Sequence, residues 1–493
     1  MLHHSLSYYL LLCFAAAGFV YVTLSKYVSY QKRRAFMQAR GCFDAHSVYP
    51  SWEPFVAGDY LWKMISSARQ KRLLDFKDSV HARYGKTFTV SSFRGTTIWT
   101  TDSENAKAML ATEFDDWAVG PARSVLEPLL GSSILLSDGT SWSHSRRIIR
   151  PIFMKDQVAD LTRLEEHVQA LFECIPKDGS TVDLQDLFHR LTLDSATEFV
   201  FGESTNSLRP DQDEEQIRFQ HNLDLFMADA IDRARFLRLY PFFRQKGAEE
   251  ALQHCHQAVD GYVRKAFARA KETKDAEKSD SSKGSKYLFL DEIARQTGDV
   301  EKTRSEALTL LFAGRDTTAS FLSMFWFLLA RHPLVWKRLL NEVDELHGEL
   351  PTYEWLRNAR YLRHCEHEGT ARHIHVRRTL LIHTALRLYP SIPIPPPRMA
   401  TRDTVLPHGG GPDGNSPLYV AKGSRFMLNL RGACRQKDVY GTDADEFNPD
   451  RWNDIRPGWV CSVTQPDAPI HPDTFCRITF RSQLDRVFVL DVS

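Results

Sequence analysis

The hydrophobic pattern of the chain is mostly helical. Apolar residues recur every three or four positions over Asp156–Ile175, and Glu306–His332 is apolar on nearly every face. The first pattern predicts an amphipathic helix, and the second predicts a helix buried at the centre of the protein. Thr87–Asp102 instead alternates β-branched and aromatic residues around an Arg-Gly turn, which predicts a β-hairpin. We therefore expect a mainly α fold with small β-sheets.

Two polar stretches interrupt this pattern. Lys271–Lys286 is charged and almost without large apolar residues, so we expect an exposed loop there. His408–Pro417 is a glycine-rich cluster between two strand-like runs. Its glycines could suggest a phosphate-binding loop, but the Gly-Lys-Ser/Thr signature and the strand-turn-helix context of such loops do not follow. A plain β-turn is the better interpretation.

The N-terminal region contains an uncharged apolar run, Tyr8–Leu24, which as a helix would span about 26 Å, close to the thickness of a bilayer core. A cleaved secretory signal carries its basic residues before the apolar run, whereas here they follow it. We therefore expect residues 1–35 to form an uncleaved transmembrane helix with a basic flank, and the body to face the cytoplasm. The basic residues of the flank are Lys26, Lys32, Arg33 and Arg34.

Charge and cysteine content narrow the class of protein. The 63 basic and 62 acidic residues leave a net charge of +1, so the chain lacks the basic footprint that nucleic-acid binding requires. The cysteines form no C-x-x-C pairs and are scattered, which favours a reducing compartment over a disulfide framework. They are Cys13, Cys42, Cys174, Cys255, Cys365, Cys434, Cys461 and Cys476.

Polar residues occur in the middle of the buried run, at Arg315–Thr318. Buried polar groups are costly unless they are satisfied, and threonine hydroxyls compete for helix carbonyls. Gly314, just before them, would let a flat ligand approach the backbone closely. A lone Asp-Thr-Thr would be best interpreted as a tolerated polar turn, but Ala-Gly-Arg-Asp-Thr-Thr between all-apolar flanks is much more specific.

This stretch resembles the oxygen-binding helix of the cytochrome P-450 family, the membrane-anchored haem-thiolate monooxygenases. Three further segments agree with the family in the family's order. Ser137–Phe153 resembles its W-x-x-x-R helix, Leu386–Ala400 the end of its E-x-x-R helix with the following strand, and Asp443–Trp459 its meander. Gly411–Val420 and Asp450–Trp459 look most like fungal alkane and fatty-acid hydroxylases. The resemblance implies the cytochrome P-450 fold.

The resemblance also implies which residues bind the cofactor, haem. Trp142 and Arg146 of the W-x-x-x-R pattern would reach a haem propionate, and Arg398 would be another propionate partner. Ala313 and Gly314 would lie beside the haem on the oxygen-facing helix. A cysteine thiolate on the iron would favour O–O cleavage.

Asp316 and Thr317 hold the positions of the family's catalytic relay, in which an acid beside a hydroxyl delivers protons for this cleavage. Apolar residues around them would form the wall expected for a hydrocarbon substrate. These are Leu311, Phe312, Ala313 and Phe321. Three phenylalanines fall in the substrate-entrance helices, where ordinary core packing is an equally good interpretation. They are Phe219, Phe226 and Phe236.

The E-x-x-R pattern is interrupted in this chain. Its glutamate should lie three residues before Arg387, where Thr384 stands, yet Glu368 lies further upstream. In the family the glutamate and arginine form a buried pair that also holds the meander arginine, here Arg451. Removing Gly369–Thr384 would bring Glu368 back into register with Arg387.

We therefore interpret Gly369–Thr384 as translated non-coding sequence, most simply a short retained intron. A genuine surface insertion is one alternative, although it would split the ion pair of a core helix. A zinc site is the other, although the spacing of its candidate ligands matches no known structural pattern. Those ligands are His364, Cys365, His367, His373 and His375.

The C-terminal segment 460–493 departs from the family as well. The family's haem-ligand loop, F-x-x-G-x-R-x-C-x-G, should follow Trp459, but neither Cys461 nor Cys476 has this context. The thiolate ligand motif is thus missing in this chain, no metal ligand is assigned, and the C-terminal part of the fold is expected to be incomplete. A second retained intron or a frameshift near Val460 would explain the change.

Two hypotheses about function follow. In the first, residues 36–459 form the domain of a monooxygenase in the endoplasmic reticulum membrane. It would hydroxylate a lipophilic substrate such as an alkane or fatty acid, using O2 and electrons from NADPH through a reductase. In the second, this chain is a haem-free, non-catalytic membrane protein from a mis-spliced gene.

Overall fold

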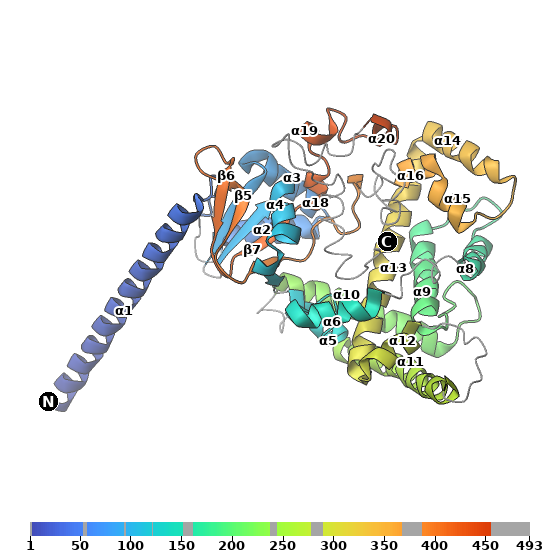
Figure 1. Cartoon of the computed structure of the whole chain (residues 1–493). Coiled ribbons are helices and arrows are strands. Elements are labelled where there is room, and N and C mark those ends of the chain that lie inside the picture. Colours follow the sequence, from blue (N-terminus) through green and yellow to red (C-terminus); the bar gives the residue numbers. More distant parts are fainter. Residues whose placement is uncertain are drawn as a thin grey trace.

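The computed structural model describes residues 2–52, 57–92, 95–120, 122–150, 161–236, 244–277, 289–366 and 387–454. Helices dominate this part of the chain, and short strands gather in two small sheets on one side of the body (Figure 1). The predicted mainly α class with small β-sheets is confirmed.

The helices have the following bounds. They are α1 (Leu2–Arg40), α2 (Gly58–Arg69), α3 (Leu73–Tyr84), α4 (Ser103–Lys107), α5 (Ala122–Leu130), α6 (Gly139–Ile149), α8 (Thr162–Glu173), α9 (Leu184–Phe201), α10 (Glu214–Phe236), α11 (Ala248–Glu277), α12 (Phe289–Thr297), α13 (Val300–Arg331), α14 (Pro333–Val343), α15 (Tyr353–Asn358), α16 (Arg360–Glu366), α18 (Leu430–Ala433), α19 (Lys437–Tyr440) and α20 (Arg451–Asp454). Short helical turns are η1 (Ala108–Thr112), η2 (Phe114–Asp116) and η5 (Asp344–Leu346).

The larger sheet joins distant parts of the sequence. Its strand order is β1-β2-β7-β4-β3, and β2 pairs in parallel with β7. The predicted hairpin is present, because β1 and β2 pair antiparallel from Thr87 opposite Thr100 to Ser92 opposite Gly95. The strands are β1 (Thr87–Ser92), β2 (Gly95–Thr100), β3 (Trp117–Val119), β4 (Arg398–Ala400) and β7 (Arg425–Leu428).

The second sheet is the hairpin β5 (Thr404–Gly410) and β6 (Ser416–Val420). Residues 411–415 of the glycine-rich cluster form the turn between these strands, as predicted, whereas 408–410 and 416–417 belong to the strands themselves. Gly411 and Gly414 in the connection both have a φ of 75°, a backbone conformation that favours glycine.

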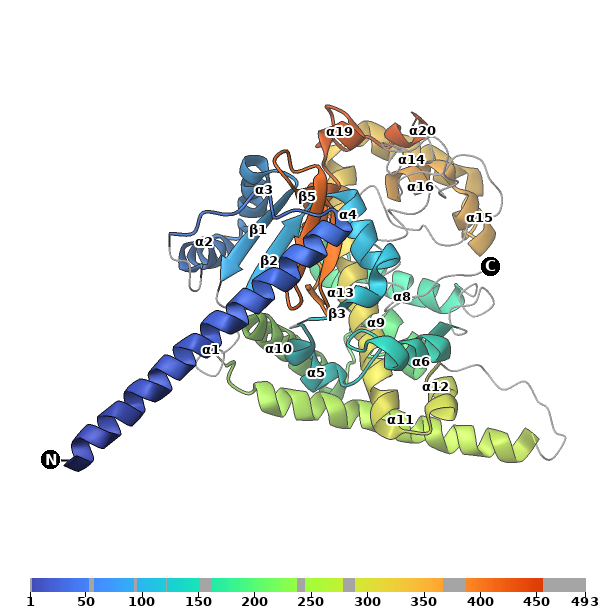
Figure 2. The ribbon, with the colours of Figure 1, turned by 60° about the vertical axis from the view of Figure 1, so that its left-hand side comes forward.

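Helix α13 runs through the centre of the body, between the sheets and α11 (Figures 1 and 2). It packs against α9, α5, α11, α12 and α14. Its side chains Leu308 and Leu311 are fully buried, as predicted for an all-apolar helix. Its N-terminus is capped by Asp299, whose carboxylate accepts hydrogen bonds from the backbone N–H groups of Glu301 and Lys302.

One buried carboxylate ties α13 to the segment before α6. Glu306 has no exposed surface, lies 2.8 Å from Lys302 Nζ, and accepts a hydrogen bond of 3.0 Å from the backbone N–H of Ile134. A buried charge is tolerated when it is paired and hydrogen-bonded in this way.

Two predicted boundaries differ from the structure. Helix α11 continues through Lys271 to Glu277, so the first part of the expected loop is helical. Alanine, glutamate and lysine in that stretch are good helix formers, which explains the extension. Residues 278–288 lie outside the described part. In the predicted helix Asp156–Ile175, the described helix is α8, Thr162–Glu173.

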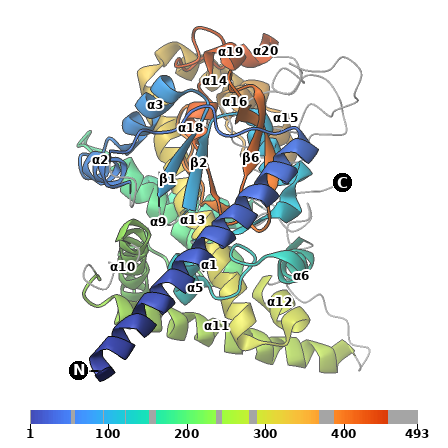
Figure 3. The ribbon, with the colours of Figure 1, turned by 90° about the vertical axis from the view of Figure 1, so that its left-hand side faces the viewer.

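The predicted anchor lies in α1, which projects away from the body in Figure 1 and crosses in front of it in the view of Figure 3. Within the described residues, no helix is both long enough and apolar enough to qualify as a membrane span. A transmembrane role for α1 is therefore not confirmed.

The end of α4 nearest β5 contains a titratable pair. Asp102, the N-cap of α4, accepts a hydrogen bond from Asn105 N–H and lies 3.1 Å from His408 Nδ1. The bond to Asp102 raises the pKa of His408. Burial opposes ionisation of Asp102, but hydrogen bonds from His408 and Asn105 outweigh burial and lower its pKa.

We predict that His408→Gln destabilises the protein most between about pH 4 and pH 6.5, by at most about 1 kcal/mol. The contribution of His408 is present below its unfolded pKa and is lost as pH rises through the raised folded value. That of Asp102 is present above its unfolded pKa and is lost as pH falls through the lowered folded value. Unfolding free energies of both proteins across this range provide the measurement. The exposed His221 on α10, changed to Gln, is the control.

Candidate active site

The predicted relay residues lie at the middle of α13. The Thr317 hydroxyl donates a hydrogen bond of 2.7 Å to the Ala313 carbonyl, one helical turn earlier. The Thr317 carbonyl accepts a 2.9 Å bond from Ser391 Oγ, which attaches the proline-rich segment before β4 to this turn. Ala313 is buried, and Asp316 and Thr317 are partly exposed. The acid and the hydroxyl thus lie side by side at the edge of the core.

Asp316 lies in an electrostatic environment that the sequence did not reveal. Its Oδ1 is 3.6 Å from Nη1 of Arg315, a side chain only 5% exposed, and Arg315 Nη2 is 2.7 Å from Asp224 Oδ1 on α10. Burial raises the pKa of Asp316, and Arg315 opposes that effect. A carboxyl that retains its proton more readily is better suited to donating one in a relay.

Gly314 faces a neighbouring helix. A Cβ at this position would lie 3.6 Å from the Cβ of Ala196 on α9, an ordinary contact distance. The contact described for Gly314 is therefore helix packing between α13 and α9, and that contact does not itself require glycine. The predicted role of Gly314 in close approach of a ligand stays a prediction.

The W-x-x-x-R residues share one face of α6, as their spacing predicts. The Arg146 guanidinium lies 5.4 Å from the centre of the Trp142 ring, which also contacts Phe114 at 5.4 Å. Asp138, just before α6, accepts hydrogen bonds of 3.0 and 3.1 Å from Val119 N–H on β3. Val119 pairs with Arg398 on β4, so the structure places Arg398 on a strand joined to the start of α6.

These residues fit the carboxylate side of haem. Trp142 supplies an indole N–H, and Arg146 and Arg398 supply permanently charged guanidinium groups, which is the donor chemistry that binds carboxylates. The three side chains lie on connected elements and are all partly exposed, although the indole N–H of Trp142 is itself buried. Cys461 and Cys476, the cysteines of the C-terminal segment, lie outside the described residues.

The predicted apolar wall is divided between two clusters. Leu311 belongs to the largest core cluster, with Phe312 packed against it, whereas Phe321 stacks on Phe325 in a separate cluster that includes Cys365. Phe321 lies more than two turns beyond Phe312 and packs against other elements, and the role of these residues as a substrate wall stays a prediction.

The entrance-helix phenylalanines of α10 are core residues where they are described. Phe219 and Phe226 are buried in the same large cluster as Leu311. The alternative interpretation as ordinary core aromatics accounts for them. The side chain of Phe236 lies outside the described part.

Arg387 and Arg451 both bind residues of the segment 434–446, which overlaps the start of the meander. Arg387, 2% exposed, donates hydrogen bonds of 3.0 Å to the carbonyls of Cys434 and Glu446 and a further bond to that of Ala444. Arg451 binds the Asp443 carboxylate with both terminal nitrogens, and this hydrogen bonding lowers the pKa of Asp443. Both arginines of the predicted cluster therefore bind the same segment, residues 434–446. Glu368 lies outside the described residues, and the ion-pair cluster stays a prediction.

The suspected insertion, Gly369–Thr384, also lies outside the described residues, as do His367, His373 and His375 of the zinc alternative. Cys365 is buried among apolar side chains. No group of three or more potential metal ligands occurs within the part of the chain that the structure describes.

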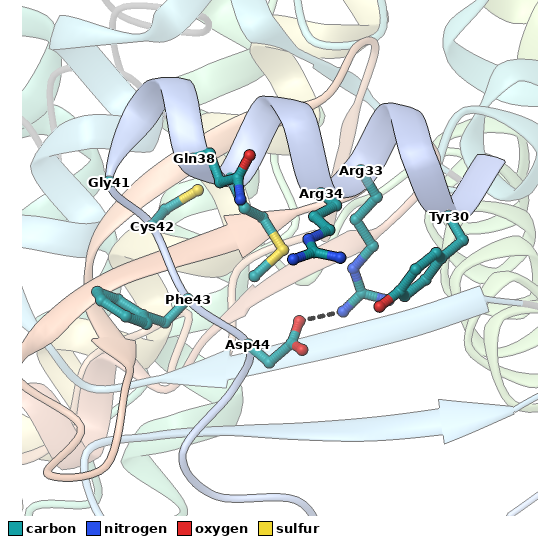
Figure 4. A pocket seen from close by; sticks show the side chains of 9 residues that line it. Tyr30, Arg33, Arg34, Gln38, Gly41, Cys42, Phe43 and Asp44 are labelled. Carbon is teal, nitrogen blue, oxygen red and sulfur yellow. Dashed lines mark hydrogen bonds and ion pairs between the residues drawn. The ribbon is translucent and has the colours of Figure 1, made fainter. Parts of the chain in front are cut away.

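A pocket of about 420 Å³ lies elsewhere, where α1 meets the body (Figure 4). Its rim includes Tyr30, Arg34 and Phe43, and Arg33 forms an ion pair there with Asp44. Arg33 also lies 5.0 Å from the ring of Tyr419 on β6. The pocket therefore belongs to the junction of α1 with the β5–β6 hairpin and not to the relay on α13.

Comparison with known proteins decides the family. The model of the family described as cytochrome P-450 matches residues 54–458, most of the chain. The chain belongs to the cytochrome P-450 family. It is therefore a member of a monooxygenase family whose cofactor is haem.

The similar proteins are fungal. The chain is 39% identical over 448 residues to cytochrome P-450 monooxygenase fsdH of Fusarium heterosporum, covering 88% of this chain and 75% of that protein. It is 38% identical over 404 residues to cytochrome P-450 52A10 of Candida maltosa, covering 79% and 74%. It is 37% identical over 418 residues to cytochrome P-450 52A13 of Debaryomyces hansenii, covering 81% and 76%.

Sequence reasoning missed Asp224 and assigned no role to Arg315. Arg315 stands in the motif itself, and a permanent charge in an all-apolar helix signals a partner on another element. The sequence offers no comparable signal for Asp224, because acidic residues are frequent along α10.

We predict that Arg387→Leu lowers the free energy of unfolding by roughly 3 kcal/mol or more, because it leaves three buried carbonyl acceptors without their charged donor. Urea unfolding of the variant provides the measurement. The exposed pair of Arg338 with Asp450 supplies the control, since Arg338→Leu should cost about 1 kcal/mol or less. Equal losses for the two variants would contradict the structural role of Arg387.

Proposed function

We propose that the functional form of this protein hydroxylates a lipophilic substrate such as an alkane or fatty acid, using O2 and electrons that pass from NADPH through a reductase. The proposal depends mainly on Asp316 and Thr317, adjacent at the middle of the buried helix α13 in a chain that matches the cytochrome P-450 family over most of its length. The largely apolar surroundings of this turn, among them Leu311 and Phe312, suit a hydrocarbon-like substrate.

Asp316 and Thr317 on α13 would bind and transfer protons. Haem with a thiolate ligand, when bound, supplies the oxygen chemistry. Asp316 would hold a proton, since burial raises its pKa, and would pass it toward the neighbouring Thr317 hydroxyl. Thr317 Oγ1 would have to leave the Ala313 carbonyl to take part, and the bond from Ser391 would keep its backbone in place.

The cofactor would be held by residues from three elements. Trp142 and Arg146 on α6 and Arg398 on β4 would bind its carboxylates, and Ala313 on α13 would lie against its face. Apolar packing of Leu308 and Leu311 in the core would exclude water from the inner side of α13.

We further propose that the chain as written lacks a positioned thiolate. The family match ends at residue 458, directly before the segment 460–493 in which the ligand motif is missing. We also propose that Gly369–Thr384 is a retained intron, because its removal restores the E-x-x-R register. If the transcript keeps this segment in every message, the intron hypothesis is wrong.

We propose a location at the endoplasmic reticulum membrane, anchored through α1. Support comes from the uncharged run Tyr8–Leu24, the basic residues that follow it, and the projection of α1 from the body (Figures 1 and 2). Extraction of the expressed protein from membranes with carbonate, compared with a form lacking residues 1–35, tests this location.

We predict that Thr317→Ala uncouples NADPH consumption from product by roughly tenfold or more, because the hydroxyl of the relay is lost. Product formed per NADPH consumed is the measurement, in a form that carries a family-type ligand loop and lacks Gly369–Thr384. The exposed neighbour Thr318, changed to Ala, is the matched control. Unchanged coupling in Thr317→Ala would contradict the role of Thr317.

We predict that the chain as written gives no thiolate-type spectrum when it is reduced under carbon monoxide. A missing metal ligand removes its binding energy from the folded state. Removing Gly369–Thr384 alone should not restore the spectrum, and a family-type ligand loop and helix after Trp459 should also be needed. A thiolate-type spectrum from the unmodified chain would instead assign Cys461 or Cys476 as the ligand.

A further inference from the structure

Arg315 joins two carboxylates that belong to different helices. Its Nη2 lies 2.7 Å from Asp224 Oδ1 on α10, and its Nη1 lies 3.6 Å from Oδ1 of Asp316, its own neighbour on α13. The first distance is that of a charge-assisted hydrogen bond, whereas the second is an electrostatic contact only. The guanidinium thus interacts more strongly with Asp224 on α10 than with Asp316.

Arg315 needs these partners because its charge is buried. The side chain is 5% exposed, and an arginine keeps its charge at any pH at which proteins fold. Among the described residues, its Nε has no hydrogen-bond partner, so the group is not saturated. A buried and incompletely satisfied cation should turn to a second acceptor when its first acceptor moves away.

Asp224 can move away more easily than Arg315. The Asp224 carboxylate is 52% exposed, and water can replace the arginine as its partner. Helix α10 packs against α11 and α5, which themselves contact α13, so a displacement of α10 relative to these helices would pull Asp224 away from α13. The pair therefore has a buried, fixed end on α13 and an exposed end on another helix.

Three charged or titratable groups surround Asp316, one from each neighbouring element. Burial raises its pKa, Arg315 on α13 and His189 on α9 lower it, and Asp224 on α10 raises it. If Asp224 leaves, the repulsion that raises this pKa disappears, and Arg315 is released toward Asp316. Both effects favour the ionised form of Asp316.

We propose that Arg315 is a positioning residue that couples the place of α10 to the charge of Asp316. With the Asp224–Arg315 pair formed, Asp316 holds its proton more readily than it does with α10 displaced. With α10 displaced, Arg315 pairs with Asp316 and holds it ionised. This inference rests on the proposed function of Asp316 as the relay acid, because it states under which arrangement of α10 that acid is protonated.

The experiment measures the titration of Asp316 in the full chain without added cofactor. The free energy of unfolding is measured between about pH 3 and pH 7 for the unmodified protein and for each variant named below. Every measurement is repeated on the same protein with Asp316→Asn added. Because the folded pKa of Asp316 is raised, its contribution to stability falls as pH rises through that value. The difference between the two curves therefore gives the midpoint of Asp316.

Asp224→Asn should lower this midpoint by about 0.5–1 pH unit, and Arg315→Gln should raise it by about 1 pH unit. With Arg315→Gln already present, the effect of Asp224→Asn should shrink, since only direct repulsion is then removed. Arg315→Lys should retain part of the coupling. Glu215→Gln removes the same charge from α10 at a carboxylate that pairs with Arg218 and His254, and should leave the midpoint unchanged.

Two outcomes would overturn the proposal. One is an unchanged midpoint in Asp224→Asn. The other is a shift of equal size with and without Arg315, which would assign the effect to direct repulsion between the carboxylates. The exposed position of Asp224 makes Asp224→Asn the variant least at risk of misfolding, so the test does not depend on the buried Arg315. Since the measurement needs no haem, its failure is distinguishable from a failure of the monooxygenase proposal, which product formed per NADPH consumed reports.

Discussion

The architecture depends on placing ionisable groups inside the apolar helix α13. This helix runs through the core and carries Glu306 and Arg315, both almost fully buried, as well as Asp316. Each buried charge is matched by a partner, and the partners come from α13 itself, from the segment before α6 and from α10. A buried charge that loses its partner costs far more than an exposed one, so the surrounding elements are held in register by the charges of the helix they cover.

The segment 434–446, which overlaps the start of the meander, also contains polar groups that need partners, here backbone carbonyls. Residues 434–446 contain little regular structure, and their carbonyls must find donors when they are buried. Arg387 supplies donors to three of these carbonyls, and Arg451 binds the Asp443 carboxylate and backbone. The two arginines thus satisfy the carbonyls of an irregular segment, as backbone hydrogen bonds satisfy those of a helix or strand.

Local patterns predicted the fold class, the hairpin of Thr87–Asp102, the buried helix and the β-turn of 408–417, because each depends on spacing within a short window. The shared face of Trp142 and Arg146 followed from helical periodicity in the same way. Phe321 was grouped with Leu311 and Phe312 but packs in another part of the core, since similar residues on one helix can face different neighbours. The role of Asp224 could not be predicted from the sequence, because it depends on a contact between helices that are distant in sequence.

The larger sheet has a consequence for how the chain is made. Strands β1 and β2 near residue 90 lie beside β7 and β4 near residues 400–428, and Phe43 pairs with Leu418. A ribosome releases the chain from its N-terminus, so the hairpin β1–β2 must wait, with one edge uncovered, until some three hundred further residues have emerged. Such late, non-local pairing is slow and leaves a strand edge open to other chains. Synthesis of this protein should therefore depend on chaperones that shield the early hairpin, and a ribosome paused before residue 425 would hold an aggregation-prone nascent chain.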